Sequence, residues 1–118
     1  MSEQPVPQLI IIAGPNGAGK SSSAAQYFAD IIEQGLYLDP DKVARDNNLS
    51  TVAAGREVLR RQSQYLAQKR DFARETTASG REPITLADQA KALGYQLTLI
   101  FVFIDKPELL QMRVAGRV

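Results

Sequence analysis

A glycine-rich segment near the start of the chain carries the clearest chemical signal in the sequence. It reads Gly14-Pro15-Asn16-Gly17-Ala18-Gly19-Lys20-Ser21 and matches the pattern G-x-x-x-x-G-K-S/T. A loop with few side chains lets backbone N–H groups converge on phosphate oxygens, and a following helix adds the positive end of its dipole. In this pattern Lys20 reaches the β- and γ-phosphates, and the Ser21 hydroxyl binds Mg²⁺. The alternative is an ordinary glycine-rich turn with Lys20 in solvent, but the strand and helix patterns on either side favour a loop that binds the phosphates of a nucleotide.

Two carboxylates, Asp39 and Asp41, flank Pro40 after a short apolar run. Asp followed by Pro is typical of a helix N-cap, so we expect Asp39 to cap a helix. Asp41 would then lie in the first helical turn, where negative charge is favoured in any helix. A carboxylate at this position could instead accept the proton of an attacking hydroxyl, which contributes about 10²–10⁴ in rate.

Further acids and hydroxyls follow two later apolar runs. Glu75 and Thr77 come at the end of the run that begins at Phe72. They are either a solvated strand end or a clamp for an acceptor substrate, because ligands bind beyond the carboxyl ends of strands. Asp105 follows another apolar run and could associate with Mg²⁺, but we favour a helix cap before Lys106 and Pro107.

Composition excludes several classes of chemistry. The 118 residues include no cysteine and no histidine, which excludes a thiol nucleophile, a serine–histidine–carboxylate hydrolase and a typical zinc enzyme. The net charge is +1, so no strong field favours nucleic acid or an anionic membrane. The basic stretch from Arg56 to Arg70 is interpreted as a solvated helix face rather than an oligonucleotide site. No secretory signal or membrane-length apolar run is present, and we expect a cytoplasmic protein.

The elements that must position these residues alternate between strand and helix. Expected strands are Leu9–Ala13, Leu36–Leu38, Phe72–Thr76 and Tyr95–Ile104. Expected helices run from Ala24 to Gly35, from Pro40 to Asn47, from a cap at Ser50 or Thr51 past Leu66, from Leu86 to Gly94 after interruptions at Gly80 and Pro83, and onward from Pro107. This order predicts one doubly wound, mostly parallel α/β sheet after a flexible segment 1–7. The strand ends at Ala13, Leu38, Glu75 and Ile104 should share one rim.

Five segments resemble the zeta toxin family of P-loop kinases. They are Gly14–Ser21, Leu38–Ala44, Ala54–Arg56, Glu75–Arg81 and Ala92–Tyr95, the last of these before an apolar strand. Their order and spacing extend over nearly the whole chain, so the resemblance is more specific than the glycine-rich loop alone.

The resemblance implies a three-layer, P-loop kinase-like domain that uses ATP and Mg²⁺ to phosphorylate a hydroxyl. In zeta toxins the acceptor is UDP-N-acetylglucosamine, and an antitoxin holds the toxin inactive. At the positions that match the family, the resemblance implies that Lys20 and Asp41 are catalytic, with Asp41 as the base. It also implies that Asp41, Glu75 and Thr77 contact the acceptor. Ser21 would bind the metal. The nucleotide contacts would be Gly14, Pro15, Asn16, Gly17, Ala18, Gly19, Lys20, Ser21, Ser22, Arg113 and Arg117. For Arg113 and Arg117, a solvated helix face is the alternative.

Two features depart from the family. Arg74 stands where the family usually has a large apolar residue, so its charge must pair, extend to solvent, or lie at the rim. The sequence ends at Val118, where family members continue, so we expect the lid and the last strand to be absent. An ATP-binding module without kinase turnover, acting through a protein partner such as an antitoxin, is the alternative function.

Overall fold

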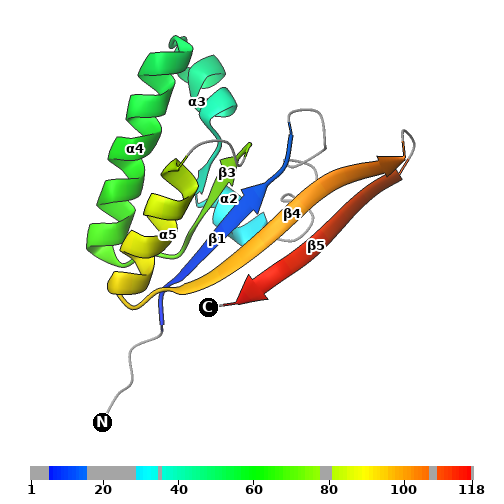
Figure 1. The fold of residues 1–118 in the computed structure, drawn as a ribbon. Helices are drawn as coiled ribbons and strands as arrows, with labels where there is room; N and C mark the ends of the chain where they lie inside the picture. The colour runs from blue at the N-terminus through cyan, green and yellow to red at the C-terminus, as the bar shows by residue number, and fades with distance from the viewer. Residues whose placement is uncertain (1–5, 16–28, 35, 78–80, 107–108, 118) are drawn as a thin grey trace.

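The computed structural model describes residues 6–15, 29–34, 36–77, 81–106 and 109–117 (Figure 1). The strands are β1 (Gln8–Ala13), β2 (Tyr37–Leu38), β3 (Phe72–Thr76), β4 (Gln96–Lys106) and β5 (Leu109–Arg117). The helices are α2 (Ala29–Glu33), α3 (Pro40–Asn47), α4 (Thr51–Gln68) and α5 (Glu82–Ala92). Of the expected N-terminal segment, residues 1–5 lie outside this description, and the Pro7 carbonyl accepts a hydrogen bond from the Gln96 amide at 2.9 Å.

The strands form one sheet in the order β2-β3-β1-β4-β5. The first four strands in this order are mutually parallel, and β5 is antiparallel to β4. The predicted α/β class with a mostly parallel sheet is therefore confirmed. Strand β1 lies at the centre, and its apolar residues from Leu9 to Ala13 are all buried. A strand that is covered on both faces can be continuously apolar, as this one is.

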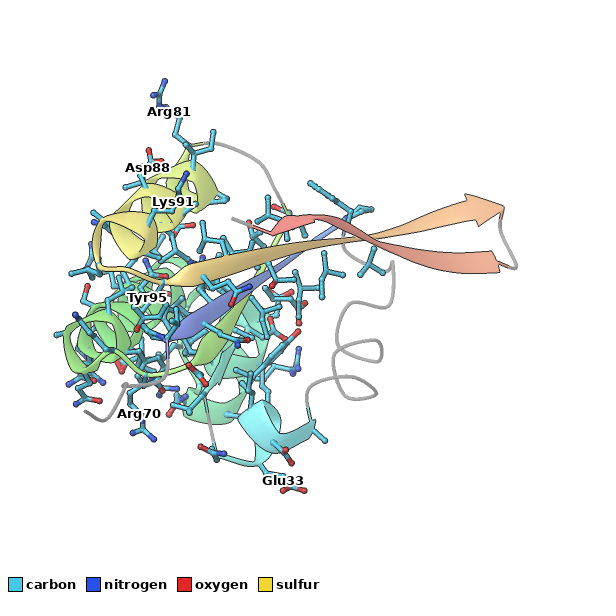
Figure 2. The ribbon with its side chains drawn as sticks, turned by 90° about the horizontal axis from the view of Figure 1, so that it is seen from below. Glu33, Arg70, Arg81, Asp88, Lys91 and Tyr95 are labelled. Carbon is cyan, nitrogen blue, oxygen red and sulfur yellow. The ribbon has the colours of Figure 1, made fainter. Side chains whose placement is uncertain are left out.

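Helices lie on both faces of this sheet, so the fold has three layers. On one face Leu9, Ile11 and Phe72 pack in a cluster with Val58 of α4 and Leu86 of α5. On the other face Ile10, Ile12, Ala73, Ile100 and Val102 form a second cluster, and Ile31 of α2 packs against it. Alternate residues of a strand point to opposite faces, which assigns neighbouring isoleucines of β1 to different clusters. Figure 2 shows α2 on the side away from α5. Among the described residues, no helix has the length and apolar character that a membrane crossing requires.

Local signals in the sequence set the helix ends. The side chain of Asp39 accepts a hydrogen bond from the Asp41 amide at 3.0 Å, which confirms Asp39 as the cap of α3. Ser50 caps α4 by accepting from the Ala53 amide at 3.1 Å, so Ser50 rather than Thr51 has this role. Pro83 does not interrupt the chain before α5 as predicted but lies within its first turn, where proline's missing N–H costs nothing.

The predicted helix after Pro107 is wrong, because the chain returns as β5 along β4. Apolar residues spaced as they are here are compatible with a helix or a strand, and the edge of β4 offers backbone partners for a strand. Ile104 is also not level with the other strand ends. Residue Ala13 pairs with Phe101, so β4 continues past the rim and Phe101 takes the place expected for Ile104.

Candidate functional site at the carboxyl edge of the sheet

The carboxyl ends of β1 and β3 adjoin at one edge of the sheet. Ala13 and Thr76 are register partners there, whereas β2 ends at Leu38, which pairs with Arg74, two residues before Thr76. The next described helix after β1 is α2, on one face of the sheet, and the next described helix after β3 is α5, on the other face. In α/β sheets, ligands bind beyond the carboxyl ends of neighbouring strands whose connections go to opposite faces.

Gly14 begins the predicted phosphate loop at this edge of the sheet. Its amide donates to the Thr76 carbonyl at 3.2 Å, so β1 stays attached to β3 one residue beyond the strand. A Cβ atom on Gly14 would lie 2.3 Å from the Val102 carbonyl oxygen, and only glycine allows this approach. Pro15 follows as an exposed residue. The other predicted nucleotide-contacting residues of the loop, Asn16, Gly17, Ala18, Gly19, Lys20, Ser21 and Ser22, lie outside the described residues.

The two acids near Pro40 have different surroundings. Asp39 is buried, at 7% exposure, and its carboxylate is engaged in capping α3. Asp41 is exposed in the first turn of the same helix. The carboxylate of Asp41 is thus accessible shortly after the end of β2, as a proton acceptor or an acceptor contact would need to be.

Glu75 is buried at 6% exposure, so its interpretation as a solvated strand-end acid is wrong. Its carboxylate Oε2 accepts a hydrogen bond from the Tyr37 hydroxyl. Thr77 follows β3 and is exposed at the rim. Tyr37 was not among the predicted site residues. The signal that could have found it is its place in the short apolar run that ends directly before Asp39.

Arg74 lies on the opposite face of β3 from Glu75 and is paired. Its Nη1 donates to Gln62 Oε1 of α4 at 2.8 Å and to the Glu82 carboxylate at the start of α5. Of the three options left for this charge, pairing is the one observed. The pairing also links β3 to both helices that cover that face, and it involves two residues that sequence reasoning did not select.

The remaining predicted site residues are in the β4–β5 hairpin. Asp105 is a strand residue where the pairing becomes irregular between Ile104 and Lys106, so its interpretation as a helix cap is wrong. Arg113 is opposite Phe101, level with the rim, whereas Arg117 is opposite Thr98, three residues back along the sheet. The backbone therefore places only one of these two arginines level with the end of β1.

An apolar pocket of about 210 Å³ adjoins the rim on the α5 side. Ala13 and Thr76 contribute to it from the strand ends, and Ile84 of α5 and Phe101 of β4 also line it. None of its lining residues is charged. The described residues near the start of the glycine-rich loop thus include an uncharged hollow on the α5 face of the sheet and the buried Glu75 carboxylate on the other face.

Comparisons of the chain with protein-family models, with curated proteins and with solved structures found no match. The resemblance to zeta toxins therefore rests on the five sequence segments between Gly14 and Tyr95 that carry it.

Proposed function

We propose that the chain is an ATP-dependent kinase of the zeta toxin type, which transfers the γ-phosphoryl group to a hydroxyl of a small acceptor. One observation carries this proposal. The G-x-x-x-x-G-K-S/T segment directly follows a buried central strand, at the edge of the sheet where β1 and β3 end side by side. That is the context in which this motif binds phosphate.

The residues present suit ATP and Mg²⁺. The loop begins at Gly14, where the Val102 carbonyl oxygen of β4 leaves no room for a Cβ atom, so a glycine is required at the first position of the motif. Mg²⁺ prefers oxygen ligands and needs only one or two from the protein, so Ser21 with phosphate oxygens is a sufficient set. When bound, the ion neutralises charge on the β- and γ-phosphates. Residues Gly14 to Ser22 would hold the nucleotide.

The other residues would handle the acceptor. Asp41 takes the proton of the acceptor hydroxyl as that oxygen bonds to the γ-phosphorus, and the bond from the γ-phosphorus to the bridging oxygen of ADP breaks. Lys20 balances the negative charge on the transferring group. Glu75 and Thr77 hold the acceptor at the end of β3. The products are the phosphorylated acceptor, ADP and a proton that Asp41 returns to water.

The test is ATP consumption by the full chain with and without UDP-N-acetylglucosamine. Lys20→Ala should reduce turnover severely, and Asp41→Asn should reduce the turnover rate about 10²–10⁴-fold. Asp46→Asn is a matched control, because Asp46 is also an exposed acid of α3 but pairs with Lys42 at 2.6 Å. Full activity in Asp41→Asn would remove Asp41 from the mechanism. Mg-ATP binding without acceptor-dependent turnover would instead favour an ATP-binding module that acts through a protein partner such as an antitoxin.

A further inference from the structure

The apolar pocket beside α5 is built on one face of the sheet. Two pairs of register partners line it, Ile11 with Leu99 and Ala13 with Phe101. Residues two apart on a strand point to the same face, and Ile11 and Leu99 belong to the cluster that α4 and α5 cover. The pocket therefore lies between this face of the sheet and α5, at the edge where β1 ends.

Small side chains leave the space between the helix and the sheet open. From α5 the pocket is lined by Pro83, Ile84 and Ala87, whereas Leu86 of the same helix is buried in the core cluster. Ala87 carries only a methyl group, and Ala13 is an equally small residue on the strand side. A hollow of about 210 Å³ remains where longer side chains would close the gap.

The pocket has a buried base and an exposed apolar margin. Ile11 and Ala13 are 3% and 5% exposed, whereas Ile84 and Phe101 are 60% and 43% exposed. Large apolar side chains in contact with water gain free energy when an apolar group covers them. An occupant of this pocket would therefore be held by apolar contact on the sheet side and on the α5 side.

The apolar surface at this place suits a small molecule better than a protein. A stable protein interface buries about 800 Å² on each partner, and only two exposed large apolar side chains lie here. The other exposed large apolar side chains of the described residues lie elsewhere. Val6 and Leu93 line a pocket that includes the turn before β4, and Val52 and Leu59 are on α4.

The lining also restricts the chemistry of the occupant. None of the lining residues is charged, so a phosphate or carboxylate group would lose hydration without a compensating partner. Thr76 supplies the polar side chain of the lining and already has another interaction in the fold, which leaves little for the polar edge of a nucleobase. An apolar cavity of about 150 Å³ holds benzene, so about 210 Å³ is enough for one ring or a short alkyl chain.

We propose that this pocket is a binding site for a small uncharged molecule with one ring or a short alkyl chain, separate from the phosphate site of the glycine-rich loop. The site lies at the carboxyl edge of the sheet, where α/β folds bind ligands. This inference goes beyond the proposed kinase function and does not depend on it. Benzyl alcohol is a suitable probe, and benzoate has the same ring with a negative charge.

The experiment is an NMR titration of the isotope-labelled full chain with each probe. Benzyl alcohol should bind saturably with a Kd of about 1 mM, as expected for eight non-hydrogen atoms, and should shift the Ile84 and Leu99 methyl signals. Benzoate should bind at least about tenfold more weakly, because its charge has no partner in the pocket.

Two variants and one control locate the binding. Ala87→Leu fills the pocket and should weaken benzyl alcohol binding at least about tenfold. Ile84→Ala should weaken it severalfold, and because Ile84 is 60% exposed this variant tests the site even if Ala87→Leu folds poorly. Ala92→Leu is the matched control, since Ala92 is an exposed residue of the same helix outside the pocket lining, and it should bind benzyl alcohol like the wild type.

Several results would overturn this site. Examples are wild-type affinity in both pocket variants, equal binding of benzoate and benzyl alcohol, and shifts that do not saturate. Displacement of benzyl alcohol by Mg-ATP would assign the pocket to the nucleotide, and a dimer that Ala87→Leu dissociates would assign it to a second copy of the chain. Because every readout is binding, a chain without kinase turnover leaves this inference standing, and loss of this site leaves the kinase proposal standing.

Discussion

Removing the carboxylate of Glu82 should destabilise the fold more than removing the guanidinium of Arg74, although the two groups form one ion pair. The difference comes from burial. The Arg74 side chain is 11% exposed, whereas the Glu82 side chain is 37% exposed. Gln62 is the other partner of the guanidinium, at 2.8 Å. Arg74 Nε is buried without a hydrogen-bond partner in the described part of the chain.

These exposures set the expected magnitudes. Losing one partner of a fully buried pair costs about 3–5 kcal/mol, and an exposed pair contributes about 0–1 kcal/mol. Because Glu82 is partly exposed, water can hydrate part of the guanidinium once the carboxylate is removed. We therefore expect Glu82→Ala to lower the free energy of unfolding by about 2 kcal/mol. Arg74→Met leaves a carboxylate that can hydrate and removes the unpartnered Nε, so its effect should be within about 1 kcal/mol of zero. The family that the sequence resembles usually has a large apolar residue at this position.

Urea unfolding followed by circular dichroism measures these differences. With a typical dependence of the unfolding free energy on urea concentration, a loss of about 2 kcal/mol lowers the urea concentration at the unfolding midpoint by about 1 M. The Arg74→Met/Glu82→Ala double variant should recover most of this loss, because no buried charge is left unpaired. Asp46→Ala is the control, since that acid pairs with Lys42 on an exposed surface and its loss should leave the midpoint unchanged. Equal damage from Arg74→Met and Glu82→Ala, or a double variant that recovers nothing, would refute this assignment of the cost to the unpaired guanidinium.

Two further variants probe the rim and the opposite end of the sheet. Gly14→Ala should lower the melting temperature and weaken Mg-ATP binding, because the new Cβ would lie 2.3 Å from the Val102 carbonyl oxygen. Gly55→Ala is the control: a Cβ there has nothing within 4 Å, so its free energy of unfolding should rise by about 0.5–1 kcal/mol. Equal effects of the two alanines on melting would contradict the steric argument. Burial, and to a smaller extent the charge of Asp71, raises the pKa of Tyr95 from 10.0 to about 12. The folded state therefore favours the neutral hydroxyl, and this contribution to the free energy of unfolding is fully present below pH 10 and is lost as the pH rises toward 12. Tyr95→Phe should cost about 1 kcal/mol at pH 7 and lose stability less steeply above pH 10 in urea unfolding, and identical alkaline profiles would count against this linkage.

Elements whose signals are local could be predicted from the amino-acid sequence. The apolar run of β1, the cap at Asp39 and the end of α3 near Asn48 each depend on a few neighbouring residues. Capping and strand burial patterns act within one or two turns, so a single sequence is enough to predict them. The alternation of these elements also predicted the parallel sheet, because short crossovers leave few other topologies.

Contacts between side chains that are distant in the sequence depended on the three-dimensional fold instead. The contact of Tyr37 with Glu75 and the cluster of Arg74 with Gln62 and Glu82 join different strands and helices. Their partners follow from register and from which face each helix covers, and no local pattern encodes either. The last strand shows the same limit. Apolar spacing after Pro107 suits a helix or a strand, and the open edge of β4, which satisfies the backbone of β5, selected the strand.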